Sequence, residues 1–152
     1  MSDGVGHLNV ARLRHGWDDP RSAGFVDAVG AINRLAERSA GFVWRLSDEA
    51  ASEGRADTGE AFGDPRVIWS LSVWTCVDAL RHFVTRTAHG AFLRRRSEWF
   101  APMPGPTYVI WPTTLDARPS LAEAAERLDR LAAQGPSLAV FDFDHIPAKS
   151  TP

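Results

Sequence analysis

The strongest constraint on the fold of this chain is a period-two strand that runs straight into a helix. Alternate residues of an extended segment point to opposite sides, and in 68–74 (IWSLSVW) the residues Ser70, Ser72 and Trp74 share one side. The other side is wholly apolar, which is typical of a strand packed against a core. Because the helix begins where the strand ends, 68–92 is expected to form one corner of the molecule.

The helix after this strand has its own start signal. Thr75 offers a hydroxyl at the N-cap position, and Asp78 stands three residues later, where a capping box places its acidic member. We expect the helix to continue to about residue 100, with a break near Gly90.

The N-terminal two thirds of the chain alternate strands with helices. Apolar spacing and glycine or proline breakers predict strands over 7–13, 41–46 and 107–111, and a helix from Asp19-Pro20 to about Ser39. Together with the strand and helix above, the order is β-α-β-β-α-β. This order predicts an α+β, ferredoxin-like split βαβ fold, with four antiparallel strands and two helices on one face.

The C-terminal part adds a further helix and a tail. Ser120 and Glu123 form a capping box for a helix over 119–135. The segment 138–143 predicts an edge strand or an arm, and 144–152 is expected to be a frayed tail.

The chain is expected to form a single domain over 1–152, with its core in 7–112. Apolar residues occur on both sides of its strands, so the sheet face away from the two helices should also be covered. A second copy of the chain would cover it in a two-fold homodimer.

Composition argues against several classes of function. A net charge of −2 over 152 residues gives no basic excess for nucleic acid, and no apolar stretch is long enough to cross a membrane. The N-terminus has no leader pattern, so a cytoplasmic location is expected. Six tryptophans and eight phenylalanines fit either a core packed with large rings or an aromatic ligand cavity.

Several segments, in the expected order, carry a resemblance to a known superfamily. They are LNVARL from Leu8, GFVWRL from Gly41, LSVW ending at Trp74, ALRHFV from Ala79 and RTAH ending at His89. Through them the chain resembles the dimeric α+β barrel superfamily, and more closely a bacterial family of unassigned function near the antibiotic-biosynthesis monooxygenases. The resemblance implies a homodimer whose strands form a barrel, with a pocket between sheet and helices in each subunit.

The resemblance also implies site residues. Heme-degrading members use an asparagine on the first strand and an iron-ligating histidine on the second helix, and Asn9 and His89 stand at those places. Their helical tryptophan is not matched, so Trp74 would serve from its strand. Cofactor-independent oxygenases of aromatic polyketides often have asparagine four residues before such a tryptophan, where this chain has Ser70. Thr85 stands where tyrosine is common in the closer family.

These residues suggest a small tailoring enzyme that binds an aromatic, polyketide-like metabolite in an apolar pocket and oxygenates it without a cofactor. Asn9 would donate to a developing oxyanion, while His89 and Arg86 would remove or hold a phenolic proton. Trp44 and Trp74 would stack on the substrate. The other residues expected to line the pocket are Ser70, Ser72, His82 and Thr85.

Two alternatives remain open at this point. The same base would serve a cyclase or isomerase, which needs proton transfer alone. A heme-binding protein or a non-catalytic ligand-binding module is the other alternative, with His89 as the iron ligand in the heme case. His82 lies about 10 Å of helix rise from His89, too far to share a metal ion, so no other metal site is expected from this helix.

Overall fold

An antiparallel sheet lies between helices in the computed structural model of the chain. The model describes residues 3–46, 62, 64, 66–88 and 96–147. The strands are β1 (Asp3–Leu13), β2 (Phe42–Arg45), β3 (Val67–Trp74), β4 (Phe100–Ala101) and β5 (Tyr108–Thr114). The long strand β1 pairs with β3 on one side and with β5 on the other; β2 pairs with β3, and the short β4 pairs with the end of β1.

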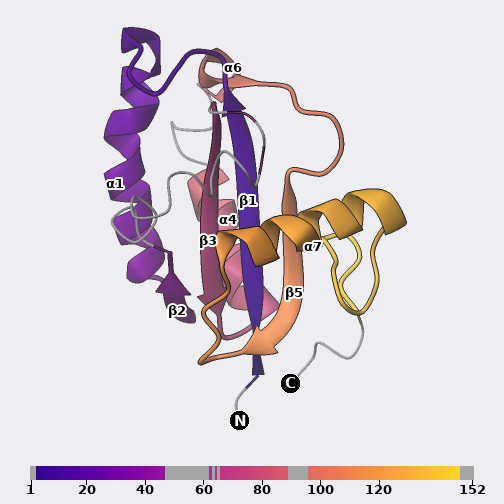
Figure 1. The fold of residues 1–152 in the computed structure, drawn as a ribbon. Coiled ribbons are helices and arrows are strands. Elements are labelled where there is room, and N and C mark those ends of the chain that lie inside the picture. The colour runs from indigo at the N-terminus through magenta and orange to yellow at the C-terminus, as the bar shows by residue number, and fades with distance from the viewer. Residues whose placement is uncertain (1–2, 47–61, 63, 65, 89–95, 148–152) are drawn as a thin grey trace.

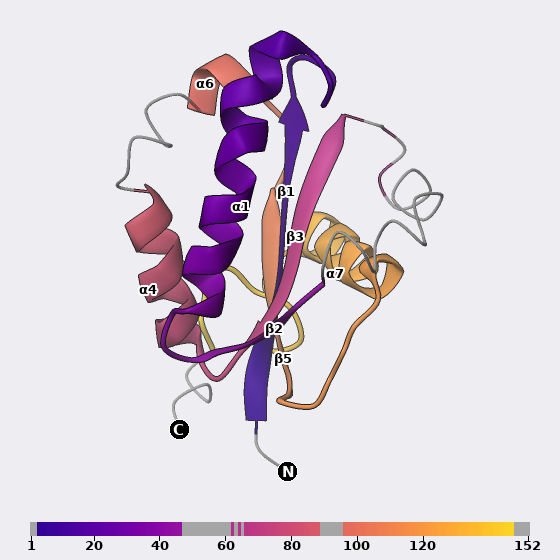
Figure 2. The ribbon, with the colours of Figure 1, turned by 90° about the vertical axis from the view of Figure 1, so that its left-hand side faces the viewer.

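Helices cover both faces of this sheet. They are α1 (Ala23–Glu37), preceded by the 3-10 turn η1 (Pro20–Ser22), α4 (Val77–Ala88), α6 (Arg96–Trp99) and α7 (Leu121–Gln134). Figure 1 shows α7 crossing the sheet, and Figure 2 shows α1 and α4 together on the opposite face. The described elements confirm the ferredoxin-like α+β fold and its additional C-terminal helix.

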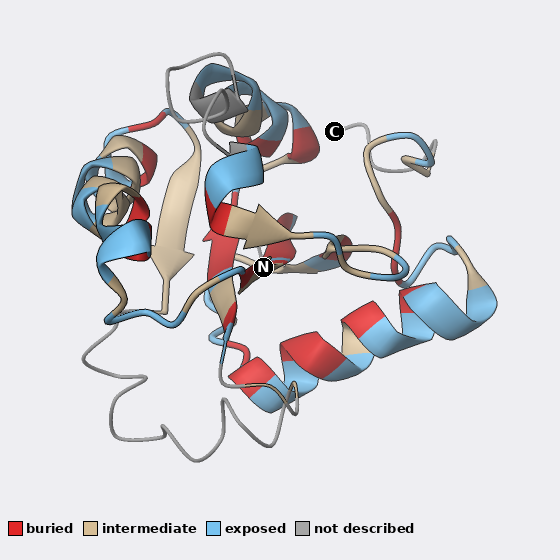
Figure 3. Cartoon of the chain, turned by 90° about the horizontal axis from the view of Figure 1, so that it is seen from above, coloured by how far each residue is buried: buried red, intermediate tan, exposed pale blue. Residues whose placement is uncertain are grey.

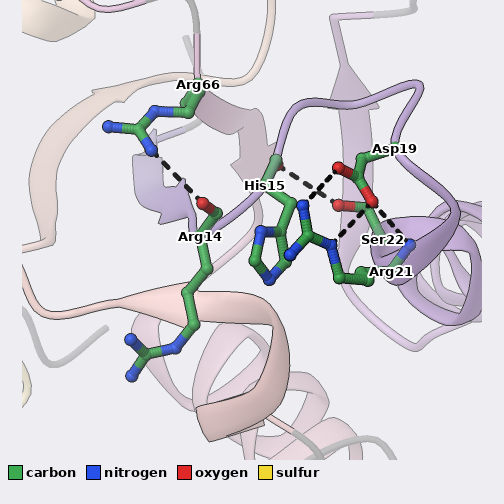
Figure 4. Close-up of polar contacts among 6 residues, drawn as sticks. All are labelled: Arg14, His15, Asp19, Arg21, Ser22 and Arg66. Carbon is green, nitrogen blue, oxygen red and sulfur yellow. Dashed lines mark hydrogen bonds and ion pairs between the residues drawn. The ribbon is translucent and has the colours of Figure 1, made fainter.

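The predicted Asp19-Pro20 start lies one turn before α1: it begins the 3-10 turn η1, and α1 itself begins at Ala23. The Asp19 side chain accepts a hydrogen bond from the backbone N–H of Arg21 at 2.9 Å, and Pro20 occupies the first turn. The hydroxyl of Ser22 donates to the carbonyl oxygen of His15 at 3.2 Å (Figure 4). These contacts fix the direction in which the chain leaves β1, so that α1 packs back along the sheet.

Gly41 makes the turn from α1 into β2. Its φ of 84° lies in the left-handed region, which glycine adopts without strain. A Cβ at this position would collide with Ala79 at the start of α4. The carbonyl oxygen of Gly41 accepts from the N–H of Thr75 at 2.8 Å, so this turn is joined to the corner that follows β3.

The face that was expected to be bare is covered by α7 from the same chain. Both halves of the predicted capping box form: Glu123 N–H donates to Ser120 Oγ, and Ser120 N–H donates to a Glu123 carboxylate oxygen, each at 3.1 Å. Buried and exposed residues alternate along α7 in Figure 3. Its buried residues pack on the sheet residues Leu8, Val10, Leu71, Val109 and Trp111. The expectation that this face is covered is therefore met by the same chain rather than by the expected second copy.

A β-bulge in β2 changes which side its aromatic residues face. Phe42 pairs with Trp74, whereas Trp44 pairs with Val73, so the register shifts by one residue between them. Phe42 packs in the cluster under α1 and α4, and Trp44 packs in the cluster under α7. Strict alternation would place Phe42 and Trp44 on the same face, and the shift in register instead separates the two rings.

The segment after β3 also differs in detail from its prediction. The helix α4 begins at Val77, and the N–H of Leu80 bonds to the carbonyl of Cys76, so Cys76 rather than Thr75 is the flanking residue. The expected long helix is described as α4 and the short α6, and the predicted break at Gly90 lies outside the described residues. Segment 138–143 forms an arm that bonds to β5 through one bridge, Ile110 with Phe141.

Candidate functional site

Four polar residues lie at the centre of the sheet on the side facing α1 and α4. In the register of β1 and β3, His7 pairs with Ser72 and Asn9 pairs with Ser70. Directly paired residues point to the same side, and Leu8, between His7 and Asn9, packs under α7. We call His7, Asn9, Ser70 and Ser72 the polar patch.

The polar patch is small and is partly open to solvent. Its two pairs lie about 7 Å apart along the strands, and the Cα atoms of each pair about 5 Å apart across them. His7 and Ser72 are buried, whereas Asn9 and Ser70 are exposed. Because β1 is an inner strand on a helix-covered face, this exposure means that α1 and α4 leave the sheet uncovered at Asn9 and Ser70.

One end of the polar patch is bordered by packed aromatic rings. Trp74 is 1% exposed; it stacks on Phe83 of α4 with ring centroids 5.2 Å apart and meets Phe42 edge-on at 5.4 Å. Its indole N–H donates to Ser72 Oγ at 2.9 Å. A buried tryptophan therefore holds the Ser72 hydroxyl in place, and the ring forms the end wall of the patch rather than an exposed stacking surface.

A second aromatic group borders the opposite end. Phe25 of α1 meets Phe100 edge-on with ring centroids 5.0 Å apart, and Trp99 lies 5.9 Å from Phe25. Leu13 and Ile68 complete this cluster from β1 and β3. The four polar residues are thus enclosed along the strands by two apolar clusters.

Residues of β5 and β2 lie beside the polar patch in the direction across the strands. On the β5 side, Tyr108 pairs with Asn9, and its ring centroid lies 6.1 Å from that of His7. The Tyr108 hydroxyl oxygen accepts from the N–H of Phe143 at 3.0 Å, and burial raises the pKa of this phenol, so it is neutral at pH 7. On the β2 side, Arg45 pairs with Ser72 and forms an ion pair with Glu37 of α1 at 3.2 Å.

His7 is the residue of this site that sequence reasoning missed. Its side chain is 7% exposed, and desolvation lowers the pKa of the imidazole from 6.5 to about 4, so the ring is neutral at pH 7. No hydrogen bond joins the ring to another described residue. The signal in the sequence is that His7 and Asn9 are two residues apart on one strand and so share a side. The predicted strand began at His7, whereas β1 begins at Asp3 and places His7 well inside it.

The two tryptophans expected to line one pocket lie on opposite faces of the sheet. Trp44 packs under α7, with the guanidinium of Arg118 5.4 Å from its ring centre, whereas Trp74 lies under α4. The β-bulge in β2 causes this separation. A single pocket walled by both rings is therefore not formed. The predicted residues that the fold does bring together are Asn9, Ser70 and Ser72, with Trp74 bonded to Ser72 at one end.

The residues expected from α4 do not point at the polar patch. A helix turns about 100° per residue, and Leu80 faces the sheet, so His82 lies about 200° away on the outer side. Thr85 and Arg86 are likewise exposed. His89 lies outside the described residues, so its proposed roles as base or iron ligand stay predictions.

The heme alternative depends on His89 as the iron ligand, and His89 lies outside the described residues, so heme binding stays a prediction. A porphyrin needs a wide apolar surface, an axial ligand and cations for its propionates. The centre of this face is polar, and Arg45 is already paired with Glu37. No group of three or more histidine, cysteine or acidic side chains that could hold a metal ion occurs in the described part of the chain.

No helix within that part is long and apolar enough to cross a membrane.

Comparisons with known proteins give two matches. A family model described as "Domain of unknown function (DUF3291)" matches residues 5–151. Among curated proteins no sequence matches. Among solved structures, the crystal structure of SnoaB, a cofactor-independent oxygenase from Streptomyces nogalater, is similar at 19% identity and a TM-score of 0.41, covering 80% of this chain and 100% of that one. This degree of similarity is too low to transfer an activity.

Proposed function

This chain belongs to the DUF3291 family, whose description assigns no activity, and we propose that it is an enzyme acting on a small phenolic or enolic aromatic metabolite at the polar patch. The reaction proposed is a cofactor-independent oxygenation that starts with deprotonation of the substrate. The same site would support a cyclisation or isomerisation if proton transfer were the whole reaction.

The observation that carries this proposal is the exposed amide of Asn9 between two aromatic clusters. Asn9 lies on an inner strand, on a helix-covered face where an apolar residue would ordinarily pack. Its side-chain NH2 group can donate hydrogen bonds to an oxyanion without carrying a charge of its own. Ser70, paired with it and also exposed, adds a hydroxyl at the same place.

The chemistry requires little more than this arrangement. A phenolate or enolate is electron-rich enough to react with oxygen directly, so the protein needs to remove a proton, exclude water and orient the anion. Oriented donors in a poorly hydrated site stabilise developing negative charge far better than water does. The two aromatic clusters supply apolar borders, and the polar patch supplies the donors.

We test the proposal with 1,8-dihydroxyanthrone as substrate, under oxygen and under argon. Asn9→Asp keeps the size of the side chain but removes its donor, so the oxygen-dependent rate should fall about 10²–10³-fold. Asp3→Asn is a matched control, because Asp3 is an exposed residue on the same strand outside the patch. It should retain the wild-type rate.

Three results would redirect the proposal. Turnover that is equal under argon would replace the oxygenase with an isomerase or cyclase. Binding without turnover would leave a ligand-binding module. No difference between the two variants would contradict the role of Asn9 altogether.

A further inference from the structure

The imidazole of His7 is a buried titratable group that the proposed function has not yet used. The His7 side chain is only 7% exposed, and no hydrogen bond joins its ring to another described residue. Burial removes water from this imidazole and lowers its pKa, a desolvation that an apolar ring at this place would not suffer. Packing alone therefore does not account for a histidine here.

We infer that His7 is the general base of the polar patch, accepting the acidic proton of a phenolic or enolic ligand whose oxygen is held by Asn9. The inference rests on the proposed function and adds to it the group that takes the proton. His7 and Asn9 are two residues apart on β1 and point to the same side, about 7 Å apart along the strand. A ligand ring of ordinary size can span that separation.

The surroundings of His7 suit a base that is neutral before it reacts. Burial keeps the imidazole uncharged at pH 7, so one ring nitrogen is free to accept a proton. The neighbouring Tyr108 is a neutral phenol. The charged groups nearest in the sheet register, Arg45 and its partner Glu37, compensate each other and lie across β3. No fixed charge on these neighbours competes for the transferred proton.

The transfer is balanced within the site. The O–H or C–H bond of the ligand breaks, its electron pair stays on the ligand, and a new N–H bond forms on the imidazole. The resulting imidazolium lies beside the anion, and opposite charges about 4 Å apart attract strongly in a poorly hydrated site. This attraction raises the pKa of the imidazole in the complex, so a group that is weakly basic in the free protein becomes an effective base once the anion forms.

The experiment uses two probes that report different steps. Alizarin changes its visible absorption when its phenol ionises, and 1,8-dihydroxyanthrone reports oxygen-dependent turnover. The variants are His7→Gln and, as a second substitution at the same place, His7→Ala. His145→Gln is the matched control, because His145 is an exposed histidine paired with Asp142 on the C-terminal arm. Circular dichroism and thermal unfolding confirm that each variant is folded.

Wild type and His145→Gln should bind alizarin as the phenolate. His7→Gln should bind it as the neutral phenol and oxidise the anthrone about 10²–10⁴-fold more slowly. Added imidazole should restore turnover to His7→Ala, which a merely structural role would not produce.

Retention of the phenolate spectrum in His7→Gln, with Asn9→Asp still impaired, would overturn the assignment of His7 and leave the proposed function in place. Failure of the wild type to bind or convert either probe would overturn both.

Discussion

At the scale of single residues, the buried histidine also makes a prediction about stability. The pKa of His7 is about 4 in the folded chain against 6.5 unfolded, so between these pH values the unfolded chain binds a proton that the folded chain does not. The free energy of unfolding should therefore fall as the pH drops from 6.5 to 4, by about 3 kcal/mol from this residue. Urea unfolding of wild type and His7→Gln at pH 7.5 and 4.5 measures the effect. The variant should lose less stability than wild type between the two pH values, and an equal loss would show that His7 charges freely in the folded state.

At the scale of elements, α7 forms part of the hydrophobic core, because its buried residues pack against the sheet. Leu128 is 8% exposed and packs on the sheet, whereas Leu138 in the following segment is 66% exposed. Leu128→Ala should therefore cost about 2–4 kcal/mol, and Leu138→Ala should change the free energy of unfolding by less than about 0.5 kcal/mol. Chemical denaturation compares this matched pair directly, and similar values for the two would contradict the packing of α7 against the sheet.

Local signals account for the parts of the fold that could be predicted. The Asp19-Pro20 start and the Ser120–Glu123 capping box depend on residues a few positions apart. The capping box forms as expected, and the Asp19-Pro20 start forms the 3-10 turn η1 that leads into α1. The bulge in β2 depends on how that strand pairs with β3, which is decided by packing far along the chain. For the same reason the patch residues Asn9, Ser70 and Ser72 could be named from the sequence, but the separation of Trp44 from Trp74 could not.

At the scale of the whole molecule, α7 changes what a dimer can look like. Because α7 covers the sheet face, a barrel made by two sheets meeting face to face would require it to move. The homodimer stays a prediction, and its interface is expected elsewhere on the surface. Light scattering should give about twice the chain mass of 16.7 kDa, and Leu128→Ala, which loosens α7, should leave that mass unchanged. A mass of one chain would contradict the dimer, and a mass that changes with the variant would place the interface at α7.

The pairing of β1 has a consequence for how the chain folds. In the chain, β1 precedes all of its partners. On one side it pairs with β5, where Asp3 meets Thr114, and its α7 face packs with residues as far along the chain as Leu131. Closing such long loops slows folding relative to proteins rich in local contacts. During synthesis β1 and β3 are therefore expected to expose a backbone edge and an apolar face until most of the chain has emerged, and surfaces of this kind favour aggregation.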